Sequence, residues 1–153
     1  MAMRIVRLGT ARGRDEGLRL GTVRLLPRGV KQQDYARLNY FDVWLPELAP
    51  SRALVSYALA KPWTDARWAV FTRRYLSEMH RPEARHFIEL LAALSKQASF
   101  SIGCYCENPS RCHRSLLGQL LHEEAGRRPA RTRTASRKAR KRKGAGAAKG
   151  GTR

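Results

Sequence analysis

The segment from Phe100 to Leu121 reads FSIGCYCENPSRCHRSLLGQLL, and it decides how the rest of the chain is interpreted. It begins as a β-prone strand, passes through a turn of polar residues and a proline, and ends with leucines at helical spacing. All three cysteines of the chain lie in it, together with Arg111, His113 and Arg114. Because α/β proteins often place anion sites and active sites where a strand passes into a helix, the segment predicts a functional site.

The sequence around this segment predicts an α/β domain. Strands are expected at residues 4–8, 22–26 and 99–106, and helices at 51–60, 65–80, 82–95 and 111–125. Residues 9–21 have the composition of a loop, and residues 41–45 form an apolar run of undetermined type. Strands first, helices in the middle and a final strand–helix unit predict a small, mostly parallel sheet with helices packed on it.

Helix starts are marked clearly. Ser51 and Thr64 are suitable N-caps, Pro82 suits a first turn, and Asn108 or Ser110 can cap the last helix. Apolar residues recur at helical spacing, which predicts core-facing positions. These positions are Trp68, Phe71, Tyr75 and Met79, then Phe87, Leu90, Leu91 and Leu94, and finally Leu116, Leu117, Leu120 and Leu121.

The charge divides the chain into two parts. The whole chain has a net charge of +19, but residues 127–153 hold 12 Lys/Arg and no Asp/Glu. This tail also lacks large apolar side chains, so it cannot bury enough surface to offset its ordering entropy. We therefore expect a domain at residues 1–126 and a disordered basic tail at 127–153. Non-specific DNA or RNA binding is expected through tail residues that include Arg137, Lys138, Arg140, Lys141, Arg142 and Lys143.

The cellular compartment is inferred from features that the sequence lacks. The start of the chain has no apolar leader, and no stretch approaches the roughly 20 apolar residues of a membrane helix. Three cysteines, two of them one residue apart, are a poor disulfide framework. These observations predict a cytoplasmic protein with reduced thiols and no membrane partner.

The cysteine-rich turn offers several chemical groups. Strand alternation places Cys104 and Cys106 on one face, with Cys104 expected in the core. At a helix start flanked by Arg111 and Arg114, Cys112 is expected to favour its thiolate, and His113 can act as an acid or base. The two arginines, joined by Arg28 from the loop after the second expected strand, would bind an anion.

Other interpretations of the same turn remain open. The stretch from Cys106 to Arg111 has the length of a rhodanese-like sulfurtransferase loop, but it has no glycine and Glu107 opposes a bound anion. A zinc site is another possibility, although the adjacent Cys112 and His113 point about 100° apart on a helix. We expect neither a metal nor a cofactor, and a role for Cys106 is left undetermined.

Four stretches of the chain, LLPRGVKQQDY, WLPELAPS, FTRRYLSEM and CYCENPSRCHRSLL, resemble the bacterial family called domain of unknown function 488. The resemblance runs from about residue 4 to residue 124 and implies a small α/β domain. It maps Arg28, Cys104, Cys112, His113 and Arg114 onto recurrent family positions. Two departures are apparent: Cys106 replaces a common acidic residue, and VRLLPRG lacks the Asp and Trp of many relatives.

Two functions are therefore expected. The first is a candidate anion-binding or catalytic site formed by Cys112, His113 and the arginines, whose ligand would be a nucleotide or another phosphorylated compound. The alternative is a nucleic-acid-associated protein that uses its tail. The sequence does not decide between them, and it does not say whether the protein is an enzyme.

Overall fold

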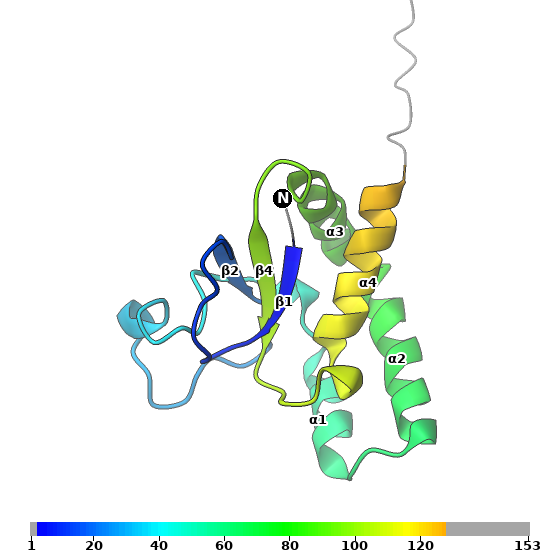
Figure 1. The fold of residues 1–153 in the computed structure, drawn as a ribbon. Helices are drawn as coiled ribbons and strands as arrows, with labels where there is room; N and C mark the ends of the chain where they lie inside the picture. Colours follow the sequence, from blue (N-terminus) through cyan, green and yellow to red (C-terminus); the bar gives the residue numbers. More distant parts are fainter. Residues whose placement is uncertain (1–2, 128–153) are drawn as a thin grey trace, which may run out of the picture.

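The centre of the fold is strand β4, Phe100–Cys104, which is buried along its whole length. Strands β1, Met3–Arg7, and β2, Leu18–Gly21, pair with its two edges in parallel, and the short β3, Val43–Trp44, pairs with β2. The computed structural model describes residues 3–127, and within them the sheet has the order β1-β4-β2-β3 (Figure 1). The α/β fold with a parallel sheet is thus confirmed.

The α-helices lie to the right of the sheet and below it in Figure 1, and the segment between β2 and β3 lies to its left. Between β3 and β4 come α1, Arg52–Ala60, α2, Asp65–Met79, and α3, Pro82–Leu94. After β4, α4, His113–Gly126, packs back against β1 and β4. Short 3-10 helices occupy Gln32–Asp34, Pro46–Leu48 and Pro109–Arg111. No helix within residues 3–127 combines the length and the apolar character needed to cross a membrane.

The predicted caps of the first helices are present. The Leu54 amide donates to Ser51 Oγ at the start of α1, and the Arg67 amide donates to Thr64 Oγ1 at the start of α2. Pro82 begins α3. Asn108, in contrast, caps the 3-10 turn that precedes α4, so the prediction that Asn108 or Ser110 caps the last helix was wrong.

The second strand was predicted four residues too late. Residues 22–26 are β-prone, but β4 ends at Cys104 and offers them no further ladder. The strand instead lies at Leu18–Gly21, where its residues pair with Phe100–Gly103 of β4. The loop expected at residues 9–21 therefore ends in a strand. Arg19 makes this strand hard to recognise in the sequence, because a charged residue is not expected at a buried strand position. Its fully buried guanidinium pairs with Glu16.

Most of the predicted core positions are buried or pack against the core. Phe71, Tyr75 and Leu117 join Ile102 in one cluster between sheet and helices. Leu90 and Leu94 of α3 are exposed, and the prediction for them was wrong because Ala84, Ile88, Leu91 and Ala92 form the buried stripe. A second cluster, which includes Leu8, Val23, Phe41, Cys104 and Cys112, lies where the strands end.

Helix α4 can approach the sheet closely because Gly118 has no side chain. A Cβ atom at this position would lie 2.6 Å from Ile5 Cδ1, well inside normal contact distance. This close approach brings the first turn of α4 to the carboxyl end of β4. The fold thereby fixes the two elements that carry the three cysteines.

Candidate functional site

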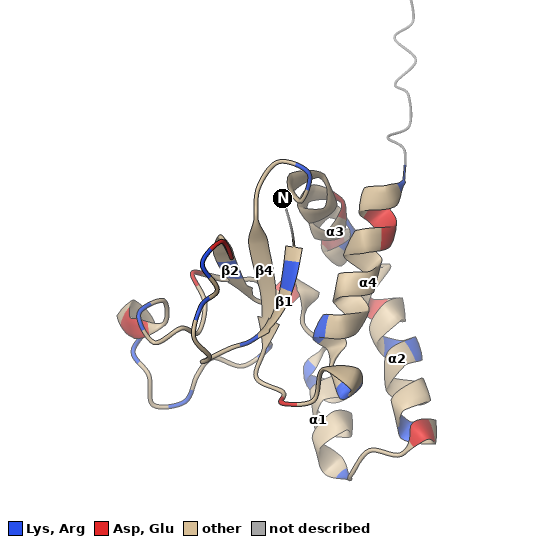
Figure 2. Cartoon of the chain, in the orientation of Figure 1, with Lys and Arg blue, Asp and Glu red and all other residues tan. Residues whose placement is uncertain are grey.

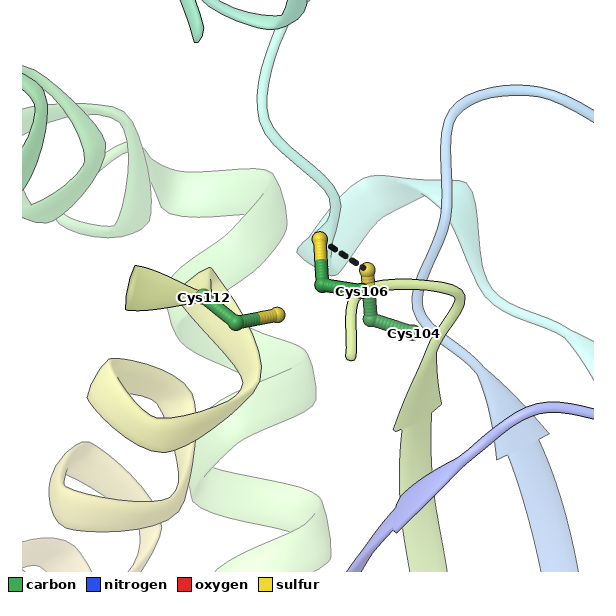
Figure 3. Close-up of side chains that lie close together, drawn as sticks. All are labelled: Cys104, Cys106 and Cys112. Atoms are coloured by element: carbon green, nitrogen blue, oxygen red, sulfur yellow. Dashed lines mark hydrogen bonds between the residues drawn. The ribbon is translucent and has the colours of Figure 1, made fainter. Parts of the chain in front are cut away.

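The three cysteine sulfurs converge where β4 ends and α4 begins. Cys104 is the last residue of β4, Cys106 follows in the turn, and Cys112 is the N-cap residue of α4. Their Sγ atoms all lie within 4.8 Å of one another, and the Cys104 and Cys106 sulfurs are 3.6 Å apart (Figure 3). We call this group the sulfur cluster. The sequence placed Cys104 and Cys106 together but did not foresee that Cys112 would join them.

The three thiols differ in their access to solvent. Cys104 and Cys112 are 6% and 2% exposed, whereas Cys106 is exposed. Burial of Cys104 on a central strand confirms the core position expected for it. Cys112 was expected to be the reactive thiolate, but its sulfur is shielded from solvent. Cys106 is therefore the accessible thiol of the cluster.

The electrostatics of the cluster favour the same residue. Hydrogen bonds from the Cys104 and Cys112 thiols, assisted by the charge of Arg114, hold the pKa of Cys106 well below its ordinary value. The bond to Cys106 and desolvation raise the pKa of Cys104 to about 11. Interactions with the other two sulfurs, together with burial, also raise the pKa of Cys112. Cys106 therefore carries the negative charge of the cluster, and the thiols of Cys104 and Cys112 stay neutral.

His113 is buried against the cluster and is held by the main chain. Its Nε2 lies 2.6 Å from the Thr22 carbonyl oxygen, which can only accept, so Nε2 carries the proton. Nδ1 is left as an acceptor, 3.9 Å from Cys112 Sγ. Desolvation lowers the pKa of His113 to about 4, so the ring is neutral near pH 7.

Arg114 is buried and donates its side-chain hydrogen bonds to main-chain carbonyl oxygens around the site. It is 4% exposed, and its Nη1 donates to the carbonyl oxygens of Val6 and Cys104 at 3.2 and 3.1 Å. Its Nη2 donates to the Glu107 carbonyl oxygen. The guanidinium therefore ties the ends of β1 and β4 to the first turn of α4, and its charge remains close to the sulfur cluster.

A cavity of about 260 Å³ opens beside the sulfur cluster. All three cysteines and His113 line one part of it. The rest of the wall is mostly apolar and is formed by residues that include Val23, Leu25, Pro50, Val55, Ala58, Leu59, Trp63 and Phe71. A concave, mostly apolar site with a few convergent polar groups is the usual form of a small-molecule site.

Two arginines line this cavity, and Arg28 is not one of them. Arg28 is exposed in the loop after β2, where it forms no hydrogen bond or ion pair with any residue in the range 3–127. Arg24, four residues earlier, lines the cavity and donates to the carbonyl oxygens of Pro50 and Ala49. Arg111 also lines it and pairs with Asp65, whose side chain is 95% exposed.

The sequence interpretation missed Arg24 and the apolar wall. Arg24 follows the carboxyl end of a parallel strand, where ligands of α/β proteins commonly bind, but this became visible only when β2 was placed at Leu18–Gly21. Trp63 stands between α1 and α2, and no local pattern connects it with the cysteines. The six tail residues expected to bind nucleic acid, Arg137 to Lys143, lie outside the described residues.

Comparison with known proteins agrees with the resemblance noted in the sequence. The family model DUF488-N3a, described as the active DUF488-N3 subclade, matches residues 3–125. Neither a curated protein nor a solved structure matches the chain. The match covers the sheet, the α-helices except the last residue of α4, and every residue of the sulfur cluster. The chain belongs to the DUF488 family.

Proposed function

We propose that the cavity binds a small anionic ligand with an apolar or aromatic body, and that the chemistry takes place at the sulfur cluster. The observation that carries this proposal is the composition of one cavity: three sulfurs and a neutral imidazole on one part, apolar side chains on the rest, and two arginines. Nucleotides and other phosphorylated compounds belong to this ligand class. The description of the matching family as active is in keeping with an enzyme.

Each group has a role in this proposal. Arg24 and Arg111 attract the anionic end of the ligand, and Trp63 and Phe71 offer aromatic faces to its body. Cys106 presents sulfur to the ligand because solvent reaches it. His113 packs against Cys112, with Nδ1 3.9 Å from its sulfur. Arg114, which the sequence placed among the anion-binding groups, acts by fixing the turn and through its nearby charge.

The test compares two alkylating reagents on the full chain. Iodoacetate and iodoacetamide both form a bond between Cys106 sulfur and carbon and release iodide, but only iodoacetate carries a negative charge. We expect the iodoacetate-to-iodoacetamide rate ratio to be several-fold higher than for a free thiol, because Arg24 and Arg111 attract the anion. Both reagents react with the same thiolate, so the ratio is independent of the pKa of Cys106.

Variants identify the charges that raise the iodoacetate-to-iodoacetamide ratio. Arg111→Gln and Arg24→Gln should each lower the ratio, whereas Arg85→Gln, which removes an exposed arginine that pairs with Glu89 on α3, should leave it unchanged. Inorganic phosphate should compete with iodoacetate more strongly than with iodoacetamide. A ratio equal to that of a free thiol, with no effect of either cavity variant, would exclude an anion-binding cavity.

A second candidate function rests on charge outside the domain. The tail holds 12 Lys/Arg and no acidic residue, whereas Lys and Arg of the described part are spread over strands, loops and helices with Asp and Glu among them (Figure 2). Non-specific nucleic-acid binding is therefore proposed for the tail alone. The two functions are compatible, since the tail would bring the cavity to DNA or RNA.

A further inference from the structure

The sulfur cluster has the geometry of a metal site. Thiolates that share one tetrahedrally coordinated zinc ion, each about 2.3 Å from the metal, lie about 3.8 Å from one another. The Cys104 and Cys106 sulfurs are already 3.6 Å apart, and all three sulfurs lie within 4.8 Å. Cys106 is exposed and lies outside the strand and the helix, so its side chain can turn toward an ion held by the other two sulfurs.

The protein surrounding the sulfurs also suits a metal. Two of the ligands would come from the end of β4 and its turn and the third from the start of α4, so the site joins two rigid elements. Arg114 Nη1 donates to the Cys104 carbonyl oxygen at 3.1 Å and so fixes the main chain of one ligand. Three thiolates and one divalent cation carry a net charge of −1, which the guanidinium of Arg114 offsets.

His113 does not have to bind the metal in this arrangement. The sequence spacing argued against a site that uses both Cys112 and His113, since adjacent helical side chains diverge. The structure removes that objection, because the three sulfurs converge while His113 Nε2 is bound to the Thr22 carbonyl oxygen. A three-cysteine set leaves a fourth coordination position free, and all three residues line the cavity.

We propose that Cys104, Cys106 and Cys112 bind one thiophilic divalent cation, represented by Zn²⁺, whose fourth coordination position faces the cavity. Soft thiolates select this class of metal over Mg²⁺ or Ca²⁺. Three protein ligands and one open position are typical of catalytic rather than structural zinc sites. The inference deepens the proposed function, because the anionic end of the ligand would complete the coordination of the metal.

The experiment uses the full chain, reduced and freed of metal with a chelator. Zn²⁺ is added in competition with a chromogenic chelator, and the stoichiometry is measured by native mass spectrometry. We expect one Zn²⁺ for each chain. Co²⁺ should give the sulfur-to-cobalt charge-transfer absorption of a thiolate site and the visible bands of tetrahedral coordination. The tail contains no Cys, His, Asp or Glu and should not contribute.

Cys106→Ser is the decisive variant because the residue is exposed and the protein should remain folded. It should weaken Zn²⁺ binding by about a hundredfold or more and remove part of the charge-transfer absorption, since a hard hydroxyl replaces a soft thiolate. His122→Ala, on the exposed face of α4, is the matched control and should bind Zn²⁺ normally. A chain that binds no Zn²⁺, or a Cys106→Ser variant with unchanged affinity, would overturn the metal site.

The two proposals fail separately. The alkylation ratio is measured on metal-free protein and depends on Arg24 and Arg111, whereas Zn²⁺ binding is measured without any anionic ligand and depends on the sulfurs. An anion preference without Zn²⁺ binding would support the anion-binding cavity and overturn the proposed metal site. Zn²⁺ binding without an anion preference would support the metal site and overturn the proposed class of ligand.

Discussion

His113 Nε2 lies 2.6 Å from the carbonyl oxygen of Thr22, and this single contact joins the first residue of α4 to the end of β2. It fixes the imidazole tautomer and directs Nδ1 toward Cys112. The contact also links the sheet side of the fold to the helix start that carries Cys112. The position of the sulfur cluster therefore depends on a side chain that is itself a candidate for the chemistry.

Replacement of His113 should show how much of the fold depends on this contact. His113→Ala leaves the buried Thr22 carbonyl without a partner and removes a packed ring, so we expect a loss of about 2 to 4 kcal/mol in the free energy of unfolding. His113→Gln can place an amide N–H near the position of Nε2 and should lose less. Urea denaturation at pH 7 measures both. His122→Ala, at an exposed position, should stay within about 0.5 kcal/mol of the parent.

Much of the fold could be predicted from local patterns. The caps Ser51 and Thr64 and the first-turn residue Pro82 act within one turn of their helices, so the sequence places those helices almost to the residue. The second strand could not be placed in this way. Its position depends on where β4 ends, and its polar residue Arg19 is satisfied by Glu16 and by carbonyl oxygens from distant loops.

Only those parts of the site that depend on local sequence patterns were predicted. The Cys104–Cys106 pair follows from strand alternation, and the position of His113 and Arg114 in the first turn of α4 follows from local helix signals. The approach of Cys112 to the other sulfurs depends on a 3-10 turn and on the docking of α4 at Gly118. Arg24 lines the cavity, and Arg28 does not, because the path of the chain after β2 places Val23, Arg24 and Leu25 at the cavity wall and carries Arg28 away from it.

Glu16 should make the free energy of unfolding depend on pH in the acidic range. Its carboxylate is buried, pairs with Arg19 at 2.6 Å and accepts a hydrogen bond from Ser101. The bond from Arg19 and the further bonds from Ser101 and the Gly13 amide lower the pKa of Glu16 from 4.5 to about 2. A lowered folded-state pKa stabilises the protein above pH 4.5, and this stabilisation is lost as the pH falls toward 2.

The change to test is Glu16→Gln. At pH 7 it leaves the fully buried Arg19 guanidinium without its counter-charge, and we expect a loss of about 3 kcal/mol. Between pH 5 and pH 3 the variant should lose less further stability than the parent chain. Glu89→Gln, from the exposed Arg85–Glu89 pair on α3, is the control and should cost less than about 0.5 kcal/mol. Parallel pH profiles for parent and Glu16→Gln would contradict this role for the ion pair.

The order in which the thiols react follows from their burial. Cys106 is exposed, while Cys104 and Cys112 are 6% and 2% exposed. Iodoacetamide should therefore label Cys106 first in the native, metal-free chain, and the other two thiols only on unfolding. Peptide mapping after a short exposure measures the order. Preferential labelling of Cys112 would contradict the burial of its side chain in the structure.

The tail should bind nucleic acid through charge alone. Each phosphate that a Lys or Arg neutralises releases condensed counterions, so the logarithm of affinity for duplex DNA should fall with the logarithm of salt by about 0.9 per contact. Six contacts would weaken binding roughly a thousandfold between about 50 and about 200 mM salt. Replacement of Arg137, Lys138, Arg140, Lys141, Arg142 and Lys143 by glutamine in the full chain should weaken binding and flatten the slope.

The matched control keeps the tail and changes the domain. A chain with Arg73, Arg74 and Arg85 of α2 and α3 replaced by glutamine loses positive charge without altering residues 127–153. It should keep most of the salt slope, whereas the tail variant should not, and several unrelated DNA sequences should bind equally because phosphate contacts do not read bases. Equal binding by the parent and the tail variant would show that these six residues do not carry the nucleic-acid contact.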